Sequence, residues 1–475
     1  MGKPTGFLEY ERVEAKAVAP KERIKNFNEF HTPLSETEQR CQSARCMDCG
    51  VPFCQSGMTI KGMTSGCPLN NLIPEWNDLV YTGNWEQAYN RLHKTSNFPE
   101  FTSRVCPALC EKACTCGLNG DAVCTKENEM AIIEHAYANG LAGPKPPKAR
   151  TGKRIAVIGS GPSGLTCAGD LAKMGYDVTI FEALHEAGGV LVYGIPEFRL
   201  PKSTVVASEI ENVKSLGVKI ETNVVIGKSM TIDQLIEEEG FDAVFIGSGA
   251  GLPRFMGIPG ENANGVFSAN EYLTRSNLMK AFRDDYDTPI ARFKKVAVVG
   301  GGNVAMDAAR TALRLGAEVH VVYRRSEAEL PARAEEVHHA KEEGIIFDLL
   351  TNPTEILADE NGWVKGIKCV KMELGEPDAS GRRKPVEIEG SEFVMDLDAV
   401  IMSLGTSPNP LISSTTKGLE INKRKCIVAE EENGQTSKEG VYAGGDAVTG
   451  AATVILAMGA GKAAAKGIDE YLSNK

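Results

Sequence analysis

The pattern of apolar positions changes along the 475-residue chain near residue 150. Before that point, stretches such as LIPEWNDLVYTGNWEQAYNRLHK and ENEMAIIEHAYANG repeat apolar residues at helical spacing. A segment rich in Gly, Pro and Lys, GLAGPKPPKARTG, then predicts a linker. Beyond it, short β-branched runs such as RIAVIGSG and VTIFEA alternate with helical stretches, which is typical of βαβ units in a parallel sheet.

The α/β region contains an internal repeat. The segment 154–182, RIAVIGSGPSGLTCAGDLAKMGYDVTIFE, aligns without gaps on 295–323, KVAVVGGGNVAMDAARTALRLGAEVHVVY. The aligned motif positions are Gly159, Gly161 and Gly164 in the first segment and Gly300, Gly302 and Ala305 in the second. FDAVFIGSGA at 241–250 and LDAVIMSLGT at 397–406 look like the closing strands of the two units. Their order predicts that the second unit is inserted into the first.

The expected fold class is therefore α/β, with two nested Rossmann-like nucleotide-binding domains preceded by a mainly helical cysteine-rich domain. A chain of 475 residues exceeds what one hydrophobic core usually serves, so several domains are expected. We expect the helical domain and linker at 1–150, the first part of the first nucleotide-binding domain at 151–290, the inserted domain at 291–407 and the second part of the first domain at 408–475.

The first unit has the features of a dinucleotide site. Its glycines lie where a strand turns into a helix, so the backbone can approach a pyrophosphate at the helix N-terminus. Glu182 ends the next strand, where a carboxylate accepts hydrogen bonds from ribose hydroxyls and repels a 2′-phosphate. The site therefore suits FAD or NAD rather than NADP. The alternative is a glycine turn that only packs helix on strand.

In the second unit, Tyr323 takes the position of Glu182 and is followed by Arg324 and Arg325. Guanidinium groups pair with phosphate oxygens in a bidentate manner, so this exchange favours the 2′-phosphate of NADPH. Arg333 could also reach that phosphate. In the alternative interpretation, both arginines lie on a solvated face and pair with the acidic residues of SEAELPARAEE.

The C-terminal segment GVYAGGDAVTGAATVILAMGAGKAAAKG predicts a strand that ends at a Gly-Gly-Asp turn and a helix that starts near Ala452. Asp446 could bind a ribityl hydroxyl or a water on the pyrophosphate. The helix N-terminus around Val454 would place a partial positive charge beside the flavin N1–C2=O group. Taken alone, however, the segment is better explained as a packing helix with a capping Asp.

The cysteines give the N-terminal domain its candidate chemistry. Ten of the 13 cysteines lie before residue 125, and the other three, Cys167, Cys369 and Cys426, are expected to be core thiols. A C-x2-C-x4-C run from Cys46, two Cys-Pro pairs and a C-x3-C spacing resemble ferredoxin-type ligation, because thiolates are soft ligands for iron and sulfide. Zinc and plain thiols stay open as alternatives, although zinc sites usually present two C-x2-C pairs.

The overall charge restricts the function classes. A net charge of −11 argues against general binding of nucleic acids or anionic membranes, which would need a basic surface. No run approaches eighteen apolar residues, and the first thirty residues hold no apolar core of a signal peptide. We therefore expect a cytoplasmic enzyme that acts on small molecules.

Four motifs resemble the glutamate synthase small (beta) subunit family: VIGSGPSGL, EAGGVLVYGIPEFRLPK, VVGGGNVAMDAAR with YRRSEAELPAR, and YAGGDAVTGAATVILAMGAG. The resemblance covers essentially the whole chain and extends to the large subunit of NADH-dependent ferredoxin:NADP oxidoreductases and to the N-terminal half of dihydropyrimidine dehydrogenase. It implies that the first unit binds FAD and the inserted unit binds NADPH. The FAD contacts would be Gly159, Gly161, Gly164, Glu182, Gly189, Gly445, Asp446 and Val454, and the candidate NADPH contacts are Gly300, Gly302, Asn303, Arg324 and Arg325.

The resemblance also implies two [4Fe–4S] clusters in the N-terminal domain. The ligands of one would be Cys46, Cys49, Cys54 and Cys114, and those of the other Cys67, Cys106, Cys110 and Glu129. Glu134 is a second candidate for the carboxylate ligand. Three surplus cysteines are close enough in sequence to substitute, namely Cys41, Cys116 and Cys124.

By this resemblance, the chain takes hydride from NADPH onto FAD and passes electrons singly through the clusters. No general base is needed between stacked rings, so no catalytic side chain is named. The chain would be the electron-donating half of a complex whose large subunit makes glutamate from glutamine and 2-oxoglutarate.

Three other functions are weighed against this one. A ferredoxin:NADP oxidoreductase or flavin-bifurcating subunit of the same build would instead pair with a small flavoprotein or a ferredoxin. A thioredoxin-reductase-like enzyme needs a redox C-x-x-C near the flavin, and none follows residue 150. An alternative of another class is a nucleotide-sensing scaffold with a zinc-binding cysteine domain.

Overall fold

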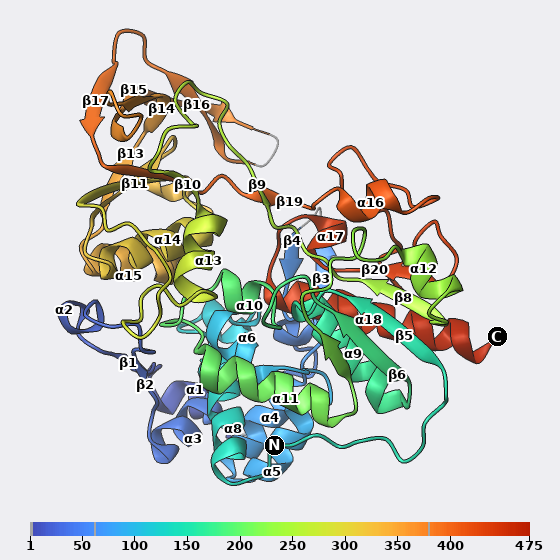
Figure 1. The fold of residues 1–475 in the computed structure, drawn as a ribbon. Helices are drawn as coiled ribbons and strands as arrows, with labels where there is room; N and C mark the ends of the chain where they lie inside the picture. The colour runs from blue at the N-terminus through green and yellow to red at the C-terminus, as the bar shows by residue number, and fades with distance from the viewer. Residues whose placement is uncertain (1–2, 61–62, 379–380) are drawn as a thin grey trace.

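The structure is a computed structural model that describes residues 3–60, 63–378 and 381–475. Figure 1 shows an N-terminal helical region in blue to cyan, an α/β unit that includes the red C-terminal helix, and a second α/β unit in yellow and orange. The expected α/β class is confirmed, with two parallel five-stranded sheets behind the helical region.

The N-terminal region is built of short helices around α4 and α8. Trp76 and Val80 of α4 and Ile132 and Ile133 of α8 are buried in its core. The elements are α1 (Gly6–Glu9), β1 (Lys16–Ala17), α2 (Pro20–Arg23), β2 (His31–Thr32), α3 (Glu36–Ala44), η1 (Phe53–Gln55), β3 (Met58–Ile60), β4 (Met63–Ser65), α4 (Ile73–Tyr81), α5 (Trp85–Leu92), α6 (Pro99–Val105), α7 (Leu109–Lys112), η2 (Thr115–Leu118) and α8 (Thr125–Ala138).

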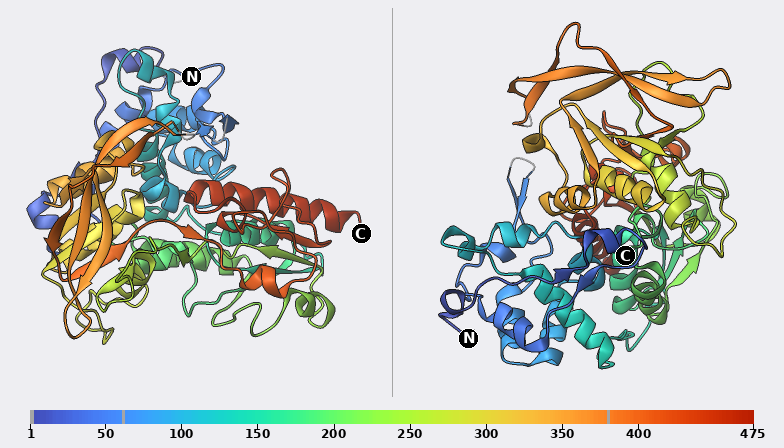
Figure 2. Two further views of the ribbon diagram at one scale, coloured as in Figure 1. Left: turned by 90° about the horizontal axis from the view of Figure 1, so that it is seen from above. Right: turned by 90° about the vertical axis from the view of Figure 1, so that its left-hand side faces the viewer.

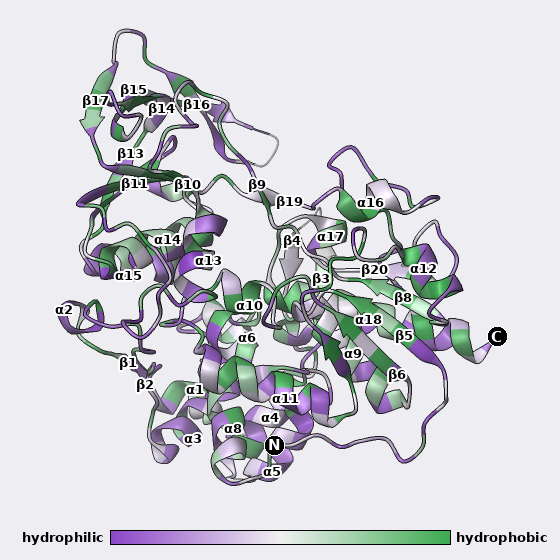
Figure 3. Cartoon of the chain, viewed as in Figure 1, coloured by the Kyte–Doolittle hydropathy of each residue, from purple (hydrophilic) through white to green (hydrophobic). Residues whose placement is uncertain are grey.

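The first sheet has the strand order β20-β8-β5-β6-β7, and all neighbouring strands run parallel. Its central strands are buried on both faces and therefore read as continuous apolar runs, which Figure 3 shows in green for β5 and β6. The elements are β5 (Arg154–Ile158), α9 (Pro162–Met174), β6 (Asp177–Phe181), α10 (Val190–Tyr193), η3 (Lys202–Val206), α11 (Ala207–Ser215), β7 (Lys219–Glu221), α12 (Ile232–Glu237), β8 (Ala243–Ile246), α16 (Leu411–Thr415), β20 (Val441–Ala443), α17 (Asp446–Thr449) and α18 (Val454–Ser473).

The second sheet repeats this arrangement with the order β10-β18-β11-β12-β13. In both sheets the predicted closing strand pairs with the strand that precedes the glycine turn, β8 with β5 and β18 with β11. The elements are β10 (Val266–Ser268), α13 (Ala269–Asn277), β11 (Lys295–Val299), α14 (Asn303–Arg314), β12 (Glu318–Tyr323), η4 (Glu327–Glu329), α15 (Ala334–Glu342), β13 (Ile346–Leu349) and β18 (Ala399–Met402). Since β20 follows the second sheet and completes the first, the nested topology is confirmed.

The chain enters and leaves the second unit through two paired strands, β9 (Leu252–Pro253) and β19 (Thr406–Ser407). They run antiparallel, with Thr406 opposite Pro253. The expected boundary at 290/291 lies inside the second unit, because β10 and α13 precede it and β10 pairs with β18. We therefore place the start of the inserted unit after β9 instead.

An antiparallel sheet that the sequence analysis did not predict covers one side of the second unit. It consists of β14 (Thr351–Ala358), β15 (Val364–Pro377), β16 (Arg383–Glu387) and β17 (Phe393–Asp396). Ile356, Ile367 and Cys369 of this sheet pack against Val299 and Val322 of the parallel sheet. The right-hand view of Figure 2 shows the antiparallel sheet at the far end of the molecule from the N-terminal helices.

The longest described helix is α18, with 20 residues. Lys462, Lys466, Asp469 and Glu470 interrupt its apolar residues. Within the three described ranges, no helix is both long and apolar enough to span a bilayer.

Candidate functional site

Three glycines shape the turn between β5 and α9. Gly159 has a φ of 95°, and a Cβ on it would lie 2.6 Å from the Gly247 carbonyl oxygen. A Cβ on Gly164 would lie 2.0 Å from the Gly159 oxygen, so α9 can pack this closely only with glycine there. A Cβ on Gly161, by contrast, would meet no described atom within 4 Å. The middle glycine thus faces open space at the helix N-terminus, where a pyrophosphate would approach.

Glu182 is buried beside this turn, directly after β6. Its carboxylate accepts hydrogen bonds from the backbone N–H of Ser160, at 2.9 Å, and from the Ser160 hydroxyl. The same hydroxyl oxygen accepts a hydrogen bond from the Gly188 N–H at 2.9 Å. A Cβ on Gly189 would lie 2.8 Å from the Gly161 Cα. The structure therefore brings the predicted residues of the first unit together, and Ser160, which the motif analysis passed over, joins their turns.

The C-terminal segment reaches the same site. A Cβ on Gly445 would lie 2.8 Å from the Ser163 hydroxyl oxygen of α9. The Asp446 carboxylate accepts a hydrogen bond from the Ala452 N–H at 3.2 Å, and burial raises the pKa of Asp446 to about 6. Helix α18 begins at Val454 and packs along α9. The segment therefore adds a carboxyl group and a helix N-terminus to the glycine turn.

Tyr193 is a further residue of this site; it lies within the EAGGVLVYGIPEFRLPK motif, but the motif alone gives it no role. Burial, together with the charges of Asp446 and Glu182, raises the pKa of Tyr193 to about 12. The phenol is therefore close to both carboxylates, which come from opposite ends of the unit. A single tyrosine at the end of a short helix has no periodic signal that could have predicted this.

The glycine turn of the second unit has the same shape. A Cβ on Gly300, which has a φ of 140°, would lie 2.2 Å from the Ser403 oxygen, whereas a Cβ on Gly302 would meet no described atom within 4 Å. Ala305 is fully buried at the third motif position. Asn303 opens α14, and its side-chain oxygen accepts a hydrogen bond from the Arg333 N–H at 2.9 Å.

The structure separates the two predicted phosphate-binding arginines. Arg325 is buried: it donates to the Arg383 carbonyl oxygen at 2.8 Å and pairs with Asp378 at 2.5 Å. Arg324 is exposed and has no hydrogen bond or ion pair within the described residues. Arg333 donates to the Cys106 carbonyl oxygen at 3.3 Å, which connects the second unit to the cysteine region. Arg324 is thus the arginine available to an incoming phosphate.

One group of thiols surrounds Cys54. Burial, with smaller contributions from the nearby Cys46, Cys114 and Cys49, raises the pKa of Cys54 to about 12. All four thiols are partly exposed. The surplus Cys116 lies next to this group but is buried, with its sulfur 3.6 Å from the Arg45 carbonyl oxygen.

A second group surrounds Cys106. Burial raises the pKa of Cys106 to about 12, and the charges of Glu129 and Cys67 act in the same direction. The pKa of Cys110 is raised by burial and then by Cys106 and, more weakly, by Cys67 and Glu129. Glu129 is enclosed, which raises its pKa to about 8, and it accepts a hydrogen bond from the Thr102 hydroxyl at 2.6 Å. The four predicted ligands of the second set are therefore neighbours.

The other candidate ligands point elsewhere. Glu134 is half exposed and pairs with Arg104. The Cys124 thiol donates to the Val13 carbonyl oxygen at 3.5 Å. Within the described residues, no three of the thiols have sulfurs all within 4.8 Å of one another.

The second thiol group lies where the cysteine region packs against the first unit. A Cβ on Gly459 of α18 would lie 3.7 Å from the Leu69 side chain and 3.9 Å from the Pro68 oxygen, so α18 runs beside the Cys67-Pro68 loop. Cys67 and Val454 also belong to one continuous hydrophobic core. The helix that begins beside the proposed flavin position is thus in contact with the loop of this thiol group.

Comparisons with known proteins agree with this arrangement. The family model for pyridine nucleotide-disulphide oxidoreductases matches residues 153–461, and the model for dihydropyrimidine dehydrogenase domain II, 4Fe-4S cluster, matches residues 23–141. The glutamate synthase (NADPH) small chain of Bacillus subtilis is 39% identical over 494 residues, which cover 99% of this chain and 99% of that protein. The chain belongs to the glutamate synthase small-chain family. It is an oxidoreductase with an FAD/NAD(P)-binding domain and a 4Fe–4S domain.

Proteins with other names are also similar to this chain. The beta subunit of the NADP+-dependent formate dehydrogenase of Moorella thermoacetica is 39% identical over 446 residues, which cover 88% of this chain and 61% of that protein. The solved structure of Mycobacterium tuberculosis FprA in complex with NADPH matches with a TM-score of 0.56 and 19% identity, over 70% of this chain and 85% of FprA. The latter similarity concerns the fold alone.

Proposed function

We propose that this chain is the electron-donating small subunit of an NADPH-dependent glutamate synthase. The observation that carries the proposal is the match to the Bacillus subtilis small chain over nearly the full length of both proteins. The two glycine turns with open middle positions support two dinucleotide sites in one chain. FAD would bind the first turn with Glu182 and Asp446, and NADPH would bind the second turn with Asn303 and Arg324.

The residues of the two sites position the reactants and carry no proton in the proposed reaction. When bound, FAD accepts the two electrons of NADPH and releases them one at a time to iron–sulfur clusters. The open sides of Gly161 and Gly302 admit the two pyrophosphates. The N-terminus of α18 contributes partial positive charge near Val454, which favours negative charge on a group bound there.

Two [4Fe–4S] clusters are part of the proposal. The first would be held by Cys46, Cys49, Cys54 and Cys114, and the second by Cys67, Cys106, Cys110 and Glu129. The second set packs beside α18 of the flavin unit, whereas the thiols of the first set are partly exposed. Electrons would therefore pass from the flavin to the second set and leave through the first.

Serine substitutions test the two ligand sets. Cys46→Ser and Cys67→Ser should each remove one cluster, about four irons per chain, because each deletes a thiolate ligand. Iron and flavin contents of anaerobically purified protein measure this loss. Cys41→Ser is the matched control and should keep all the iron. Full iron content in either ligand variant would contradict the assignment.

The surface near the first cluster, where electrons would leave, is suited to docking of a partner protein. Val51, Phe53 and Leu118 are 76%, 54% and 82% exposed, and they lie on the segments that carry Cys49, Cys54 and Cys114. Exposed apolar residues grouped in this way mark protein–protein contacts. The large subunit would cover this surface and accept electrons from the first cluster.

The decisive experiment measures NADPH oxidation by the holoprotein mixed with the glutamate synthase large subunit. Oxidation should depend on both glutamine and 2-oxoglutarate. Phe53→Glu should lower the rate at least about tenfold by weakening association, whereas Val394→Glu, at an exposed apolar position on β17, should not. Activity with a ferredoxin or a formate dehydrogenase partner, and none with the large subunit, would favour the rival role that the Moorella thermoacetica relative suggests.

A further inference from the structure

Two histidines and a glutamate meet between the N-terminal region and the inserted unit. His31 lies on β2, and Glu335 and His339 lie one turn apart on α15. One ligand atom from each of the three side chains lies within 4.8 Å of the other two. Side chains gathered in this way can surround a single ion.

The imidazole rings of this cluster lack hydrogen-bond partners. The Nδ1 atoms of His31 and His339 are buried and have no partner among the described residues. Phe30 holds both rings in place, since its ring centroid is 4.5 Å from that of His31 and 5.2 Å from that of His339. Buried ring nitrogens are rarely left unsatisfied, so a bound species is expected to contact them.

The two rings are also in the protonation state that a metal requires. Burial lowers the pKa of His31 to about 4 and that of His339 to about 4. Both imidazoles are therefore neutral at physiological pH, and each keeps a nitrogen lone pair for coordination.

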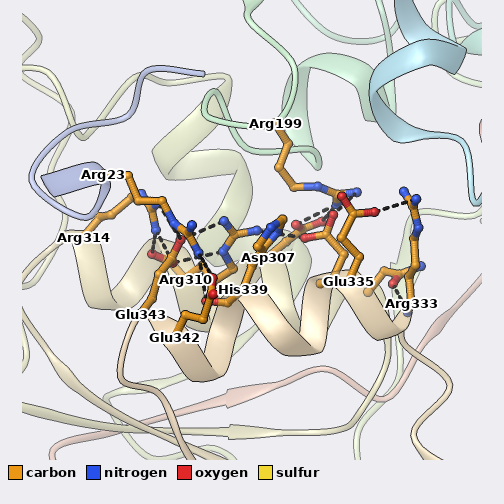
Figure 4. A network of polar contacts seen from close by, with 12 residues as sticks. Arg23, Arg199, Asp307, Arg310, Arg314, Arg333, Glu335, His339, Glu342 and Glu343 are labelled. Atoms are coloured by element: carbon orange, nitrogen blue, oxygen red, sulfur yellow. Dashed lines mark hydrogen bonds and ion pairs between the residues drawn. The ribbon is translucent and has the colours of Figure 1, made fainter. Parts of the chain in front are cut away.

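Glu335 supplies the carboxylate of the cluster. Its Oε2 pairs with Arg333 at 2.5 Å and lies 4.0 Å from the Lys126 Nζ. Figure 4 shows Glu335 and His339 on the same helix, with Arg333 joined to Glu335. A cavity of about 40 Å³, lined in part by His31 and Glu335, adjoins the cluster and has room for a water molecule.

The remaining cations around the cluster are already neutralised. Arg310 pairs with Glu336 and Glu343, each at 2.8 Å. Arg23 pairs with Glu343 at 2.7 Å. A positive ion at the cluster would therefore face paired guanidinium groups rather than free ones.

We propose that His31, Glu335 and His339 bind a divalent transition metal ion of the zinc class, with a water molecule as the fourth ligand. Two imidazoles and one carboxylate form a ligand set that zinc accepts. Because His31 belongs to the N-terminal region and the other two ligands belong to the inserted unit, the ion fastens the two together. The proposal does not depend on which protein accepts the electrons.

Zinc content and coordination test the proposal. Anaerobically purified holoprotein, loaded with zinc sulfate and freed of excess zinc by gel filtration, should retain about one zinc per chain. His31→Ala and His339→Ala should bind zinc at least about tenfold more weakly, because each removes a ligand. His338→Ala, which changes the exposed neighbour of His339 on the same helix, is the matched control and should bind normally. Zinc X-ray absorption should show only nitrogen and oxygen neighbours.

Further measurements separate loss of zinc binding from a folding defect. Flavin and iron contents report on the fold of each variant, and Glu335→Gln preserves the shape of the site while weakening a ligand. Zinc should raise the unfolding midpoint of the unaltered protein by roughly 2 °C and that of Glu335→Gln by less. Zinc–sulfur scattering near 2.3 Å, or equal zinc retention by His31→Ala and the unaltered protein, would overturn the proposal.

Discussion

The three motif glycines of the β5–α9 turn meet different physical demands. Gly159 and Gly164 are enclosed by backbone oxygens, whereas Gly161 faces open space. The first two are therefore required by the packing of the unit, whereas the middle one leaves room for a ligand to approach. The sequence motif alone does not separate these roles.

Alanine substitutions should separate the two roles. Gly164→Ala should destabilise the first unit by about 1–3 kcal/mol through overpacking. Gly161→Ala should leave the unfolding midpoint of the apoprotein unchanged and lower its FAD content at least about tenfold, because the new methyl group occupies the pyrophosphate side. Flavin-to-protein ratios and thermal unfolding measure both effects. Gly169→Ala, at an open position on the same helix, is the control.

Arg324 and Arg325 should also differ in function. Arg324→Ala should raise the KM for NADPH roughly tenfold or more and leave that for NADH nearly unchanged, because it removes a charge-assisted contact to the 2′-phosphate. Steady-state kinetics with both nucleotides measure the difference. Arg292→Ala, at an exposed arginine of the same unit, should change neither value. An equal rise for both nucleotides would contradict the role of Arg324.

The sequence placed these two arginines side by side but could not tell them apart. Arg325 is held by Asp378 and the Arg383 carbonyl oxygen, which lie more than fifty positions further along the chain. The same applies to His31 and His339, which no local pattern connects. Spacing reveals contacts within one turn or one helix, whereas these contacts exist only after distant strands have packed.

Among the elements, α11 presents a buried acid to a cavity. Glu209 helps to line a cavity of about 370 Å³ between the N-terminal helices and the first unit. Burial raises the pKa of Glu209 to about 8, and one of its oxygens has no partner among the described residues. The carboxyl group is therefore protonated in the folded protein at neutral pH.

This raised pKa predicts how stability depends on pH. Because the folded state binds the Glu209 proton more tightly than the unfolded state, stability should fall as the pH rises from about 4.5 to about 8. Glu209→Gln should remove this contribution and stabilise the protein at pH 8 by a few kcal/mol, about 1.4 for each pKa unit. Denaturant unfolding from pH 5 to 9 measures it. Glu211→Gln, exposed on the same helix, should leave the slope unchanged.

The predicted elements differ in how strongly the sequence specified them. The buried parallel strands and the helix that became α8 carried a clear pattern, since each buries a continuous run or one helical face. The strands β14 to β17 were missed. No position of the short strand β17 is fully buried, and charged residues interrupt β15, so neither strand forms the continuous buried run that marked the parallel strands.

On the scale of the molecule, a buried ion pair joins the two nucleotide units. Arg199, on the loop before η3, contacts both oxygens of Asp307 on α14 at 2.8 and 2.9 Å and Glu336 at 3.1 Å. Figure 4 shows this contact within a larger network that includes Arg23 from the N-terminal region. This network of ion pairs thus joins the N-terminal region, the first unit and the inserted unit.

Breaking this pair should loosen the units. Asp307→Asn should destabilise their contact by about 3–5 kcal/mol, because it leaves a buried guanidinium partly unpaired. Faster hydrogen exchange in α14 and in the Arg199 loop measures the effect. Arg275→Ala, which breaks an exposed pair on α13, should change stability by less than about 1 kcal/mol. Unchanged exchange in Asp307→Asn would show that other contacts hold the units.

The pairing of β9 with β19 has a consequence for how such a protein can change over time. Because the chain leaves and re-enters the first unit at neighbouring positions, everything between them is attached like a large loop. A loop of this kind can grow, be exchanged for another nucleotide-binding module, or be lost, without moving the strands of the first sheet. The nucleotide preference of the inserted unit can thus evolve separately from the dinucleotide site of the first unit.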